Sequence, residues 1–240
     1  MEPIKERIEH YWAHRADAFR ELRLREFDDD KHLRWLAEFR RYLPGDRPLR
    51  ILDLGTGTGF FALILAAEGH DLTGIDLTPE MIRGAKISAG ILDLPAEFLV
   101  MDAEQPDFPP ESFDALVTRN LTWTLPHLPQ AYRAWFDLLR PGGVLINFDA
   151  DYYRAQERED MELPENHAHK NLPTWMEQEN KIITLEVGSR QQPRPQWDVQ
   201  LLTECGFERI IVDNGVWKRI YAEADEFYNP VPIFTIAAFK

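Results

Sequence analysis

The sequence predicts an α/β fold in which helices cover both faces of a mostly parallel, doubly wound sheet. Strand-like apolar runs alternate with helix-like segments from residue 49 to residue 150, and this alternation is typical of parallel strands joined by right-handed crossovers. A glycine-rich turn, "GTGTG", joins the first strand-like run to a helix-like run. With 240 residues, of which 44% are hydrophobic, the chain is long enough to bury the core of one such domain.

The first 48 residues predict two amphipathic helices that form an N-terminal cap. Between Ile4 and Leu43 the apolar residues recur at spacings of three and four, the period of a helix with one buried face. Asp28–Asp30 supply an N-cap for the second helix, and Pro44-Gly45 ends it.

Residues 49–150 predict the ligand-binding core of the sheet. The expected strands are Arg50–Gly55, His70–Asp76, Ala96–Asp102, Phe113–Asn120 and Val144–Ala150. The expected helices are Phe60–Glu68, Pro79–Ala89 and Pro129–Leu139, the last closed by the turn "RPGG". Because parallel strands bind ligands beyond their carboxyl ends, the site is expected at that edge.

The remainder predicts an insertion and the completion of the sheet, within a single domain. Residues 151–195 are polar and proline-rich, and we expect them to form a cap over the carboxyl edge of the sheet. Residues 196–240 contain a helix that ends at Gly206, followed by the strand-like runs Glu208–Asp213 and Ile233–Lys240.

Composition excludes several classes of partner. The 27 Lys and Arg against 41 Asp and Glu give a formal charge of -14, which repels a nucleic-acid backbone. Met1–Trp12 has no signal-peptide pattern, and the longest apolar run, Phe60–Ala67, is too short to cross a bilayer. A single cysteine, Cys205, indicates a reducing compartment, and we expect its side chain to pack against the helix face. We expect a cytoplasmic monomer or homodimer with no nucleic-acid or membrane partner.

The glycine loop indicates which ligand is bound. Dinucleotide-binding folds use G-x-G-x-x-G, so that bare backbone can approach a pyrophosphate. Here the glycines are Gly55, Gly57 and Gly59, and Phe60 stands at the third dinucleotide position. Asp53 would repel a pyrophosphate but attract an ammonium and a sulfonium, so the loop indicates S-adenosylmethionine. A turn without a ligand, and a nicotinamide-dependent oxidoreductase with an atypical loop, remain alternatives.

Two further carboxylates end expected strands. Asp76 ends the second strand, where an acidic side chain can accept both hydroxyls of a ribose. Asp102 ends the third, where its carboxylate or a neighbouring amide can contact an adenine edge, and Met101 and Leu77 offer apolar contacts to the ring.

Four motifs in order give the chain a family resemblance. They are "LDLGTGTG" (Leu52–Gly59), "GIDLTPEMI" (Gly74–Ile82), Phe98–Leu116 and "LLRPGGVLI" (Leu138–Ile146). With these motifs the chain resembles the class I S-adenosylmethionine-dependent methyltransferases, and among them the small-molecule branch that includes the UbiE-like quinone methyltransferases. The resemblance covers about residues 11–148.

The resemblance implies a Rossmann-like, seven-stranded sheet whose last strand is antiparallel. It also implies S-adenosylmethionine as the methyl donor, with S-adenosylhomocysteine as the product. The cofactor-binding residues it implies, together with the positions argued above, are Asp53, Gly55, Thr56, Gly57, Gly59, Asp76, Leu77, Met81, Met101, Asp102, Ala103, Arg119, Asn120 and Tyr11.

The methyl acceptor is expected to be a small molecule that is attacked at oxygen, nitrogen or carbon. Amino-methylating DNA enzymes of the family carry Asn/Asp-Pro-Pro-Tyr/Phe after the fourth strand, where this chain has "RNLTW" (Arg119–Trp123). Carbon methylation of cytosine and arsenic methylation need thiols that Cys205 alone does not supply. Because in-line displacement from a sulfonium requires alignment more than acid-base chemistry, no catalytic signature is required.

The candidates for the acceptor site lie after the fourth and fifth strands and on the first helix. His127 is the candidate general base, with a helix cap or a solvent-exposed ring as the alternative. Trp123, Asp149, Tyr152, Tyr153 and His14 are candidates for the acceptor pocket. Core packing for Trp123, a solvated strand end for the next three, and an apolar stripe for Tyr11 remain open.

No metal site is expected, because His167 and His169 in the insertion have no suitably spaced third ligand. A non-catalytic protein that binds S-adenosylmethionine and regulates another process is a further alternative. It differs from a methyltransferase only in turning over no acceptor.

Overall fold

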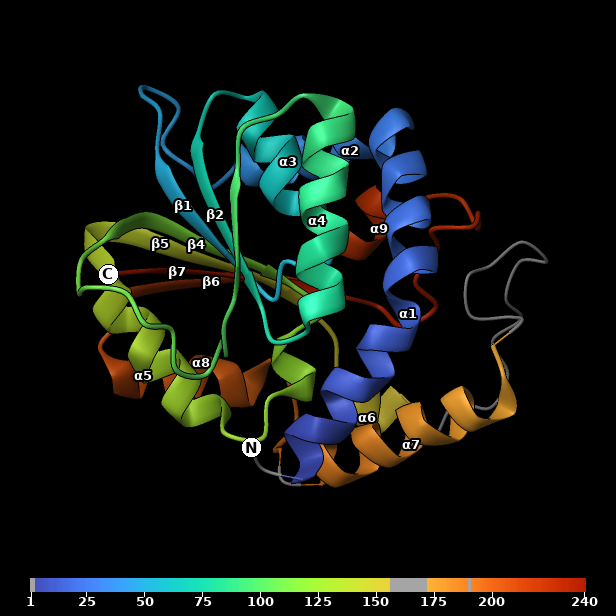
Figure 1. The fold of residues 1–240 in the computed structure, drawn as a ribbon. Coiled ribbons are helices and arrows are strands. Elements are labelled where there is room, and N and C mark those ends of the chain that lie inside the picture. The colour runs from blue at the N-terminus through green and yellow to red at the C-terminus, as the bar shows by residue number, and fades with distance from the viewer. Residues whose placement is uncertain (1–2, 156–171, 190) are drawn as a thin grey trace.

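The fold contains one seven-stranded sheet with helices on both faces (Figure 1). The structure, a computed structural model, describes residues 3–155, 172–189 and 191–240. The strands, in the spatial order β3-β2-β1-β4-β5-β7-β6, are β1 (Arg50–Leu54), β2 (Asp71–Asp76), β3 (Glu97–Val100), β4 (Phe113–Arg119), β5 (Leu139–Asp149), β6 (Arg209–Asp213) and β7 (Phe234–Phe239). The helices are α1 (Pro3–Asp28), α2 (Lys31–Phe39), α3 (Phe60–Ala67), α4 (Pro79–Leu92), the 3-10 helix η1 (Thr122–Thr124), α5 (Leu128–Leu138), α6 (Tyr152–Ala155), α7 (Thr174–Gly188), α8 (Gln196–Cys205) and α9 (Val216–Ile220).

The strand directions confirm the expected Rossmann-like topology. Strands β1 to β5 pair in parallel, whereas β7 lies antiparallel between β5 and β6. The order reverses between β1 and β4, since the chain builds outward to β3 and then returns to the other side of β1. A ligand site is therefore expected beyond the carboxyl ends of these two strands.

Two apolar layers hold the helices to the sheet. On one face α2, α3, α4 and α9 pack over the strands, and on the other α5 and α8 do so (Figure 1). In the first layer Trp35 and Phe39 of α2 make edge-to-face contacts with Phe61 and Phe148, a preferred aromatic geometry. Helix α2 thus belongs to the core rather than to a cap. Of the two N-terminal helices, α1 is the one that extends to the carboxyl edge.

Several elements differ from the sequence prediction. Strand β5 begins at Leu139 and includes the expected turn 140–143, because Gly142 donates to the Lys240 carbonyl (2.8 Å) and Lys240 donates to Gly143 (2.9 Å). Helix α4 continues to Leu92 and ends where Asp93 adopts a left-handed conformation. The short helices η1, α6 and α9 were not expected, since five residues or fewer show no helical period.

The insertion supplies a helix at the carboxyl edge. Helix α7 contacts α1, α6 and η1 (Figure 1), so this described part of the insertion lies at the carboxyl edge. His167 and His169 lie outside the described residues. Among the described residues no helix is long and apolar enough to cross a bilayer, and no group of three or more metal-ligating side chains comes together.

Candidate active site

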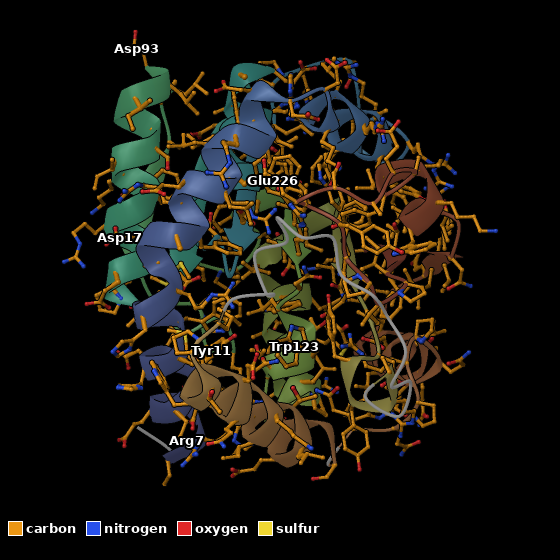
Figure 2. All side chains as sticks on the ribbon, turned by 90° about the vertical axis from the view of Figure 1, so that its right-hand side faces the viewer. Arg7, Tyr11, Asp17, Asp93, Trp123 and Glu226 are labelled. Carbon is orange, nitrogen blue, oxygen red and sulfur yellow. The ribbon has the colours of Figure 1, made fainter. Side chains whose placement is uncertain are left out.

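A cavity of about 440 Å³ opens at the carboxyl edge of the sheet. It is lined by the glycine loop, the ends of β2 to β4, α1, α7 and the segment that precedes β7. Tyr11 of α1 and Trp123 of η1 belong to one apolar cluster and lie close to α7 (Figure 2). The cavity is therefore bounded by the sheet on one side and by α1 and the insertion on the other.

The glycine loop adopts a backbone conformation that disfavours side chains. Gly55, Gly57 and Gly59 have φ of 64°, 55° and 90°, in the left-handed region that glycine adopts without strain. A Cβ atom on Gly55 would lie 2.7 Å from Leu121 Cδ1. Gly55 and Gly57 line the cavity together with Thr56, so the loop presents bare backbone to a ligand.

Asp53 lines the cavity and also holds the loop. Its Oδ2 accepts hydrogen bonds from Thr56 Oγ1 (2.6 Å) and from the backbone N–H of Ala62 (3.1 Å). Burial raises the pKa of Asp53 to about 7, although these two hydrogen bonds act in the opposite direction. The carboxyl group is thus poised to change charge near neutral pH.

Asp76 is bonded to the loop as well. Its Oδ2 accepts from the Gly57 backbone N–H and its Oδ1 from the Thr78 backbone N–H, both at 2.9 Å. Burial raises the pKa of Asp76, against the effect of these two bonds. Since each carboxylate oxygen has a second lone pair, Asp76 can still accept the two hydroxyls of a ribose from the cavity.

Asp102, which follows β3, is bonded to α1. Lys5 Nζ donates to Asp102 Oδ2 (2.6 Å) and also pairs with Glu104. Burial alone would lower the pKa of Lys5, but the bonds to these two carboxylates raise it. The N-terminal turn of α1 is therefore fastened over the end of β3.

A cluster of charged and aromatic groups forms the opposite end of the cavity. Buried Glu26 of α1 accepts from both Arg23 and Arg119, with Arg119 Nη1 at 3.3 Å. Burial alone would raise the pKa of Glu26, but Arg119 and Arg23 lower it to about 2. Arg119 Nη2 also donates to Tyr221 Oη (3.0 Å), and its guanidinium lies 4.4 Å from the ring centroid of Trp35.

Asn120 connects β4 to the insertion and to the segment before β7. Its Oδ1 accepts from Tyr152 Oη (2.9 Å), which in turn accepts from Asn229 Nδ2 (2.7 Å). The ring of Tyr152 also lies 5.0 Å from that of Trp123. Burial raises the pKa of Tyr152, so its hydroxyl stays protonated and acts as a donor.

The comparisons with known proteins agree with this geometry. Residues 52–147 match the family described as "Methyltransferase domain". The match runs from β1 to β5 and includes the glycine loop. S-adenosylmethionine is the methyl donor of this family.

The curated relatives of this region are named for different methyl acceptors. The chain is 39% identical over 105 residues to demethylmenaquinone methyltransferase from Thermus thermophilus, covering 41% of this chain and 46% of that protein. The chain spans less than half the length of the curated relatives that it matches first.

Solved structures support the fold. An S-adenosylmethionine-dependent methyltransferase from Thermotoga maritima superposes with a TM-score of 0.63 at 18% identity, covering 96% of this chain and 99% of that one. Phosphoethanolamine N-methyltransferase 2 from Haemonchus contortus, solved with S-adenosylmethionine, superposes with a TM-score of 0.60 at 19% identity, covering 85% and 51%.

Most of the predicted cofactor-binding residues lie at the cavity. The predicted residues that line it are Asp53, Gly55, Thr56, Gly57, Asp76, Leu77, Met81, Asp102, Ala103, Arg119, Asn120 and Tyr11. Gly59 instead forms the left-handed turn into α3, where a Cβ would meet Phe98 at 3.0 Å. Met101 lies outside the cavity, because its side chain packs in the second core layer and its sulfur accepts from the Asp107 N–H (3.3 Å).

The structure separates four of the candidates for the acceptor pocket. Trp123 and Tyr152 line the cavity, whereas Asp149 and Tyr153 do not. Asp149 is fully buried beneath η1, where it accepts from the Trp123 N–H (2.9 Å). Tyr153 packs under α7. A Cβ atom added to Gly188 of this helix would lie 2.4 Å from the Cβ of Tyr153.

The predicted histidines also lie away from the cavity. His127 is the N-cap residue of α5, and its backbone N–H donates to Glu104 Oε1 (2.6 Å). His127 thus has the position of a helix cap, but its side chain makes no capping hydrogen bond and does not line the cavity. His14 is directed to the outside of α1, where its ring lies 5.1 Å from Trp175. Cys205 is half-buried against the second core layer, as expected for a packing cysteine.

The sequence prediction missed the residues that α1 and the C-terminal segment contribute. Arg23, Tyr221 and Phe227 line the cavity, and Glu26 binds two of the arginines. A charged residue on the buried face of α1 was the available signal, since Glu26 falls in register with Leu22 at helical spacing. No periodic pattern marks residues 221–231, because they form no regular element.

Proposed function

We propose that the protein is a methyltransferase that transfers the methyl group of S-adenosylmethionine to a small molecule at oxygen, nitrogen or carbon. The observation that carries this proposal is the continuous cavity, which joins the glycine loop and Asp76 to an aromatic chamber under α1 and α7. A donor and an acceptor bound in one cavity can meet without solvent between them.

The residues at the loop end fit the cofactor. Gly55 and Gly57 leave backbone exposed where a side chain would fill the cavity, and Asp76 has lone pairs for a ribose diol. Asp102 and Leu77 lie where an adenine is expected, and Asp53 offers a carboxyl group toward a cation. When bound, S-adenosylmethionine supplies an electrophilic methyl group on a sulfonium.

The residues at the other end align an acceptor rather than deprotonate it. None of the histidines that the structure describes lines the cavity. Tyr152 and Tyr221 have raised pKa values, so their hydroxyls are donors at neutral pH. An acceptor that is already deprotonated needs only alignment, which the aromatic walls supply while they exclude water.

The same proposal addresses partners and compartment. Small-molecule acceptors fit an enclosed cavity of this size. The formal charge of -14 disfavours nucleic-acid acceptors, and the lone Cys205 favours the cytoplasm.

Two measurements test the proposal. In calorimetry and thermal unfolding, S-adenosylhomocysteine should bind and stabilise the protein, by about 2.7 kcal/mol at a hundredfold excess over its Kd, whereas NAD and NADP should not. Incubation with a labelled methyl donor and a metabolite library should then transfer label to at least one acceptor. Tight NAD binding without S-adenosylhomocysteine binding would overturn the proposal. Cofactor binding without transfer to any acceptor would favour a regulatory protein.

A further inference from the structure

At one end of the cavity, two arginine side chains pair with a single buried carboxylate. Arg23 and Arg119 both line the cavity, and both pair with the single carboxylate of Glu26. The other carboxylate at this end, Glu226, pairs with Arg25 at 2.9 Å. Figure 2 shows Glu226 beside α1, further along the helix than Tyr11. Two guanidinium groups thus share one counter-charge.

The geometry of the two arginines leaves donors for a ligand. Arg119 Nε is buried and has no hydrogen-bond partner among the residues that the structure describes. Arg23 lies with its guanidinium 4.5 Å from the ring centroid of Phe19, and its pKa is lowered by burial and by the charge of Arg119. A buried donor without a partner is costly, and an anion bound beside Arg119 would supply a partner for this Nε.

This end of the cavity lies away from the expected position of the cofactor's adenosine. The predicted contacts to the adenosine lie at the ends of β2 and β3, whereas Arg119 ends β4, on the other side of β1 in the sheet. Tyr221 and Phe227, which follow α9, close the same end. The cofactor's adenosine and the arginine pair therefore occupy opposite ends of one cavity.

The walls around the arginines are aromatic. Phe19, Phe60, Tyr221 and Phe227 all line this end, and Arg119 lies 5.5 Å from the ring centroid of Phe60. Such walls favour a flat, apolar frame, and arginine forms paired hydrogen bonds to carboxylates. Building on the proposed function, we propose that the methyl acceptor is an aromatic molecule that carries a carboxylate, and that Arg23 and Arg119 bind this carboxylate.

The test uses benzoate and its neutral counterpart benzamide as probes, with the protein saturated with S-adenosylhomocysteine. Titration calorimetry of the unchanged protein should show benzoate binding at least about tenfold more tightly than benzamide, as charge-assisted hydrogen bonds imply. Arg119→Gln and Arg23→Gln should each reduce this preference to about threefold or less. Arg20→Gln is the matched control, because Arg20 lies one turn earlier on α1, pairs with exposed Asp17 and does not line the cavity. It should keep the full preference.

A change at Glu26 should act in the opposite direction. Glu26→Gln removes the carboxylate that competes with the ligand, so benzoate should raise the Tm of this variant more than that of the unchanged protein. Arg119→Gln leaves Arg23 and Glu26 as a balanced pair, so this variant should fold. If it does not, Arg23→Gln, which leaves Arg119 paired with Glu26, carries the same test.

The possible results separate this inference from the proposed function. Absence of S-adenosylhomocysteine binding would overturn the proposed function. Normal cofactor binding with equal affinity for benzoate and benzamide would overturn the inference alone. If the arginine variants weaken binding of S-adenosylhomocysteine but not of its decarboxylated form, the pair binds the cofactor's own carboxylate, and the acceptor assignment is wrong.

Discussion

Asp53 combines two roles that require different charges. As a neutral carboxyl group it is compatible with its burial under the glycine loop, while as a carboxylate it can attract a cationic ligand. Its pKa of about 7 places the balance between these states near neutral pH. The charge of a bound ligand can therefore shift the protonation of this one residue.

We predict that the preference for S-adenosylmethionine over S-adenosylhomocysteine increases from pH 6 to pH 8. The raised pKa means that the empty site favours the protonated form, and a sulfonium favours the ionised form, so binding of the donor becomes tighter as the pH rises through about 7. Both ligands carry the same amino group, so the ratio of their Kd values isolates the sulfonium. Calorimetry at pH 6, 7 and 8 gives this ratio. Asp53→Asn should make it independent of pH, and an unchanged slope in that variant would exclude Asp53.

Asp76 is predicted to contribute to cofactor affinity through the ribose. Asp76→Ala should weaken binding of S-adenosylhomocysteine by about 1.5–3 kcal/mol, the usual contribution of hydrogen bonds to a charged group. Asp71→Ala is the control, since Asp71 begins the same strand and its side chain is 73% exposed. Unchanged affinity in a folded Asp76→Ala variant would show that this carboxylate does not hold the ribose.

At the scale of elements, η1 is held by a buried charged network behind the cavity wall. Asp149 accepts from the Trp123 N–H, and Gln191 Nε2 donates to the Thr122 carbonyl (3.2 Å). Arg194 Nη2 donates to Thr122 Oγ1 (2.5 Å). The end of the insertion thus fixes the 3-10 turn that presents Trp123 to the cavity.

Arg194→Met is predicted to destabilise the protein by about 3–5 kcal/mol, because it leaves the buried carboxylates of Asp149 and Asp198 without their partner. Urea unfolding followed by fluorescence measures this change. Arg83→Met is the control: Arg83 pairs with Glu80 at 3.8 Å on the surface, and its loss should cost about 0–1 kcal/mol. A similar small loss for Arg194→Met would mean that the network contributes no stability.

The elements that the sequence predicted well are those with a period long enough to detect. Strands β1 to β4 and helices α3, α4, α5 and α8 alternate in a pattern that defines a parallel sheet. The extended conformation of residues 140–143 depends instead on hydrogen bonds to residue 240, almost one hundred positions away. Such a contact leaves no local signal, and neither does a five-residue helix such as α9.

For the site, the sequence predicted the edge of the sheet but not the direction of each side chain. Asp53 and Asp76 lie at the carboxyl ends of β1 and β2, Asp102 follows β3, and all three line the cavity. Asp149 also ends a strand, yet it is directed below η1, which the sequence did not reveal. His127 follows β4 in the chain, but η1 lies between them, and His127 is at the start of α5.

At the scale of the whole molecule, the cavity joins parts that are distant in sequence. Helix α1, helix α7 and residues 221–231 each line it, and Arg7 of α1 pairs with Glu179 of α7 at 2.8 Å. A ligand in the cavity would contact all three parts at once. Their stability is therefore coupled to its binding.

We predict that saturating S-adenosylhomocysteine slows amide hydrogen exchange in α1, α7 and residues 221–231, because the ligand stabilises these segments against local opening. Mass spectrometry of the protein with and without the ligand measures the exchange. Helix α5 is the internal control, since it covers the opposite face of the sheet, and it should change only with global stability. Protection confined to the glycine loop would show that α1 and α7 do not respond to the ligand.

The position of β7 constrains the order in which the sheet can assemble during synthesis. Strands β5 and β6 do not pair with each other, because β7 lies between them and bonds to both. A ribosome releases Phe234–Phe239 after every other strand, so until then β5 is an open edge and β6 has no neighbour. A nascent chain that has emerged only as far as β6 therefore exposes apolar strand edges that can pair with other chains. These edges are covered only when β7 pairs with both β5 and β6.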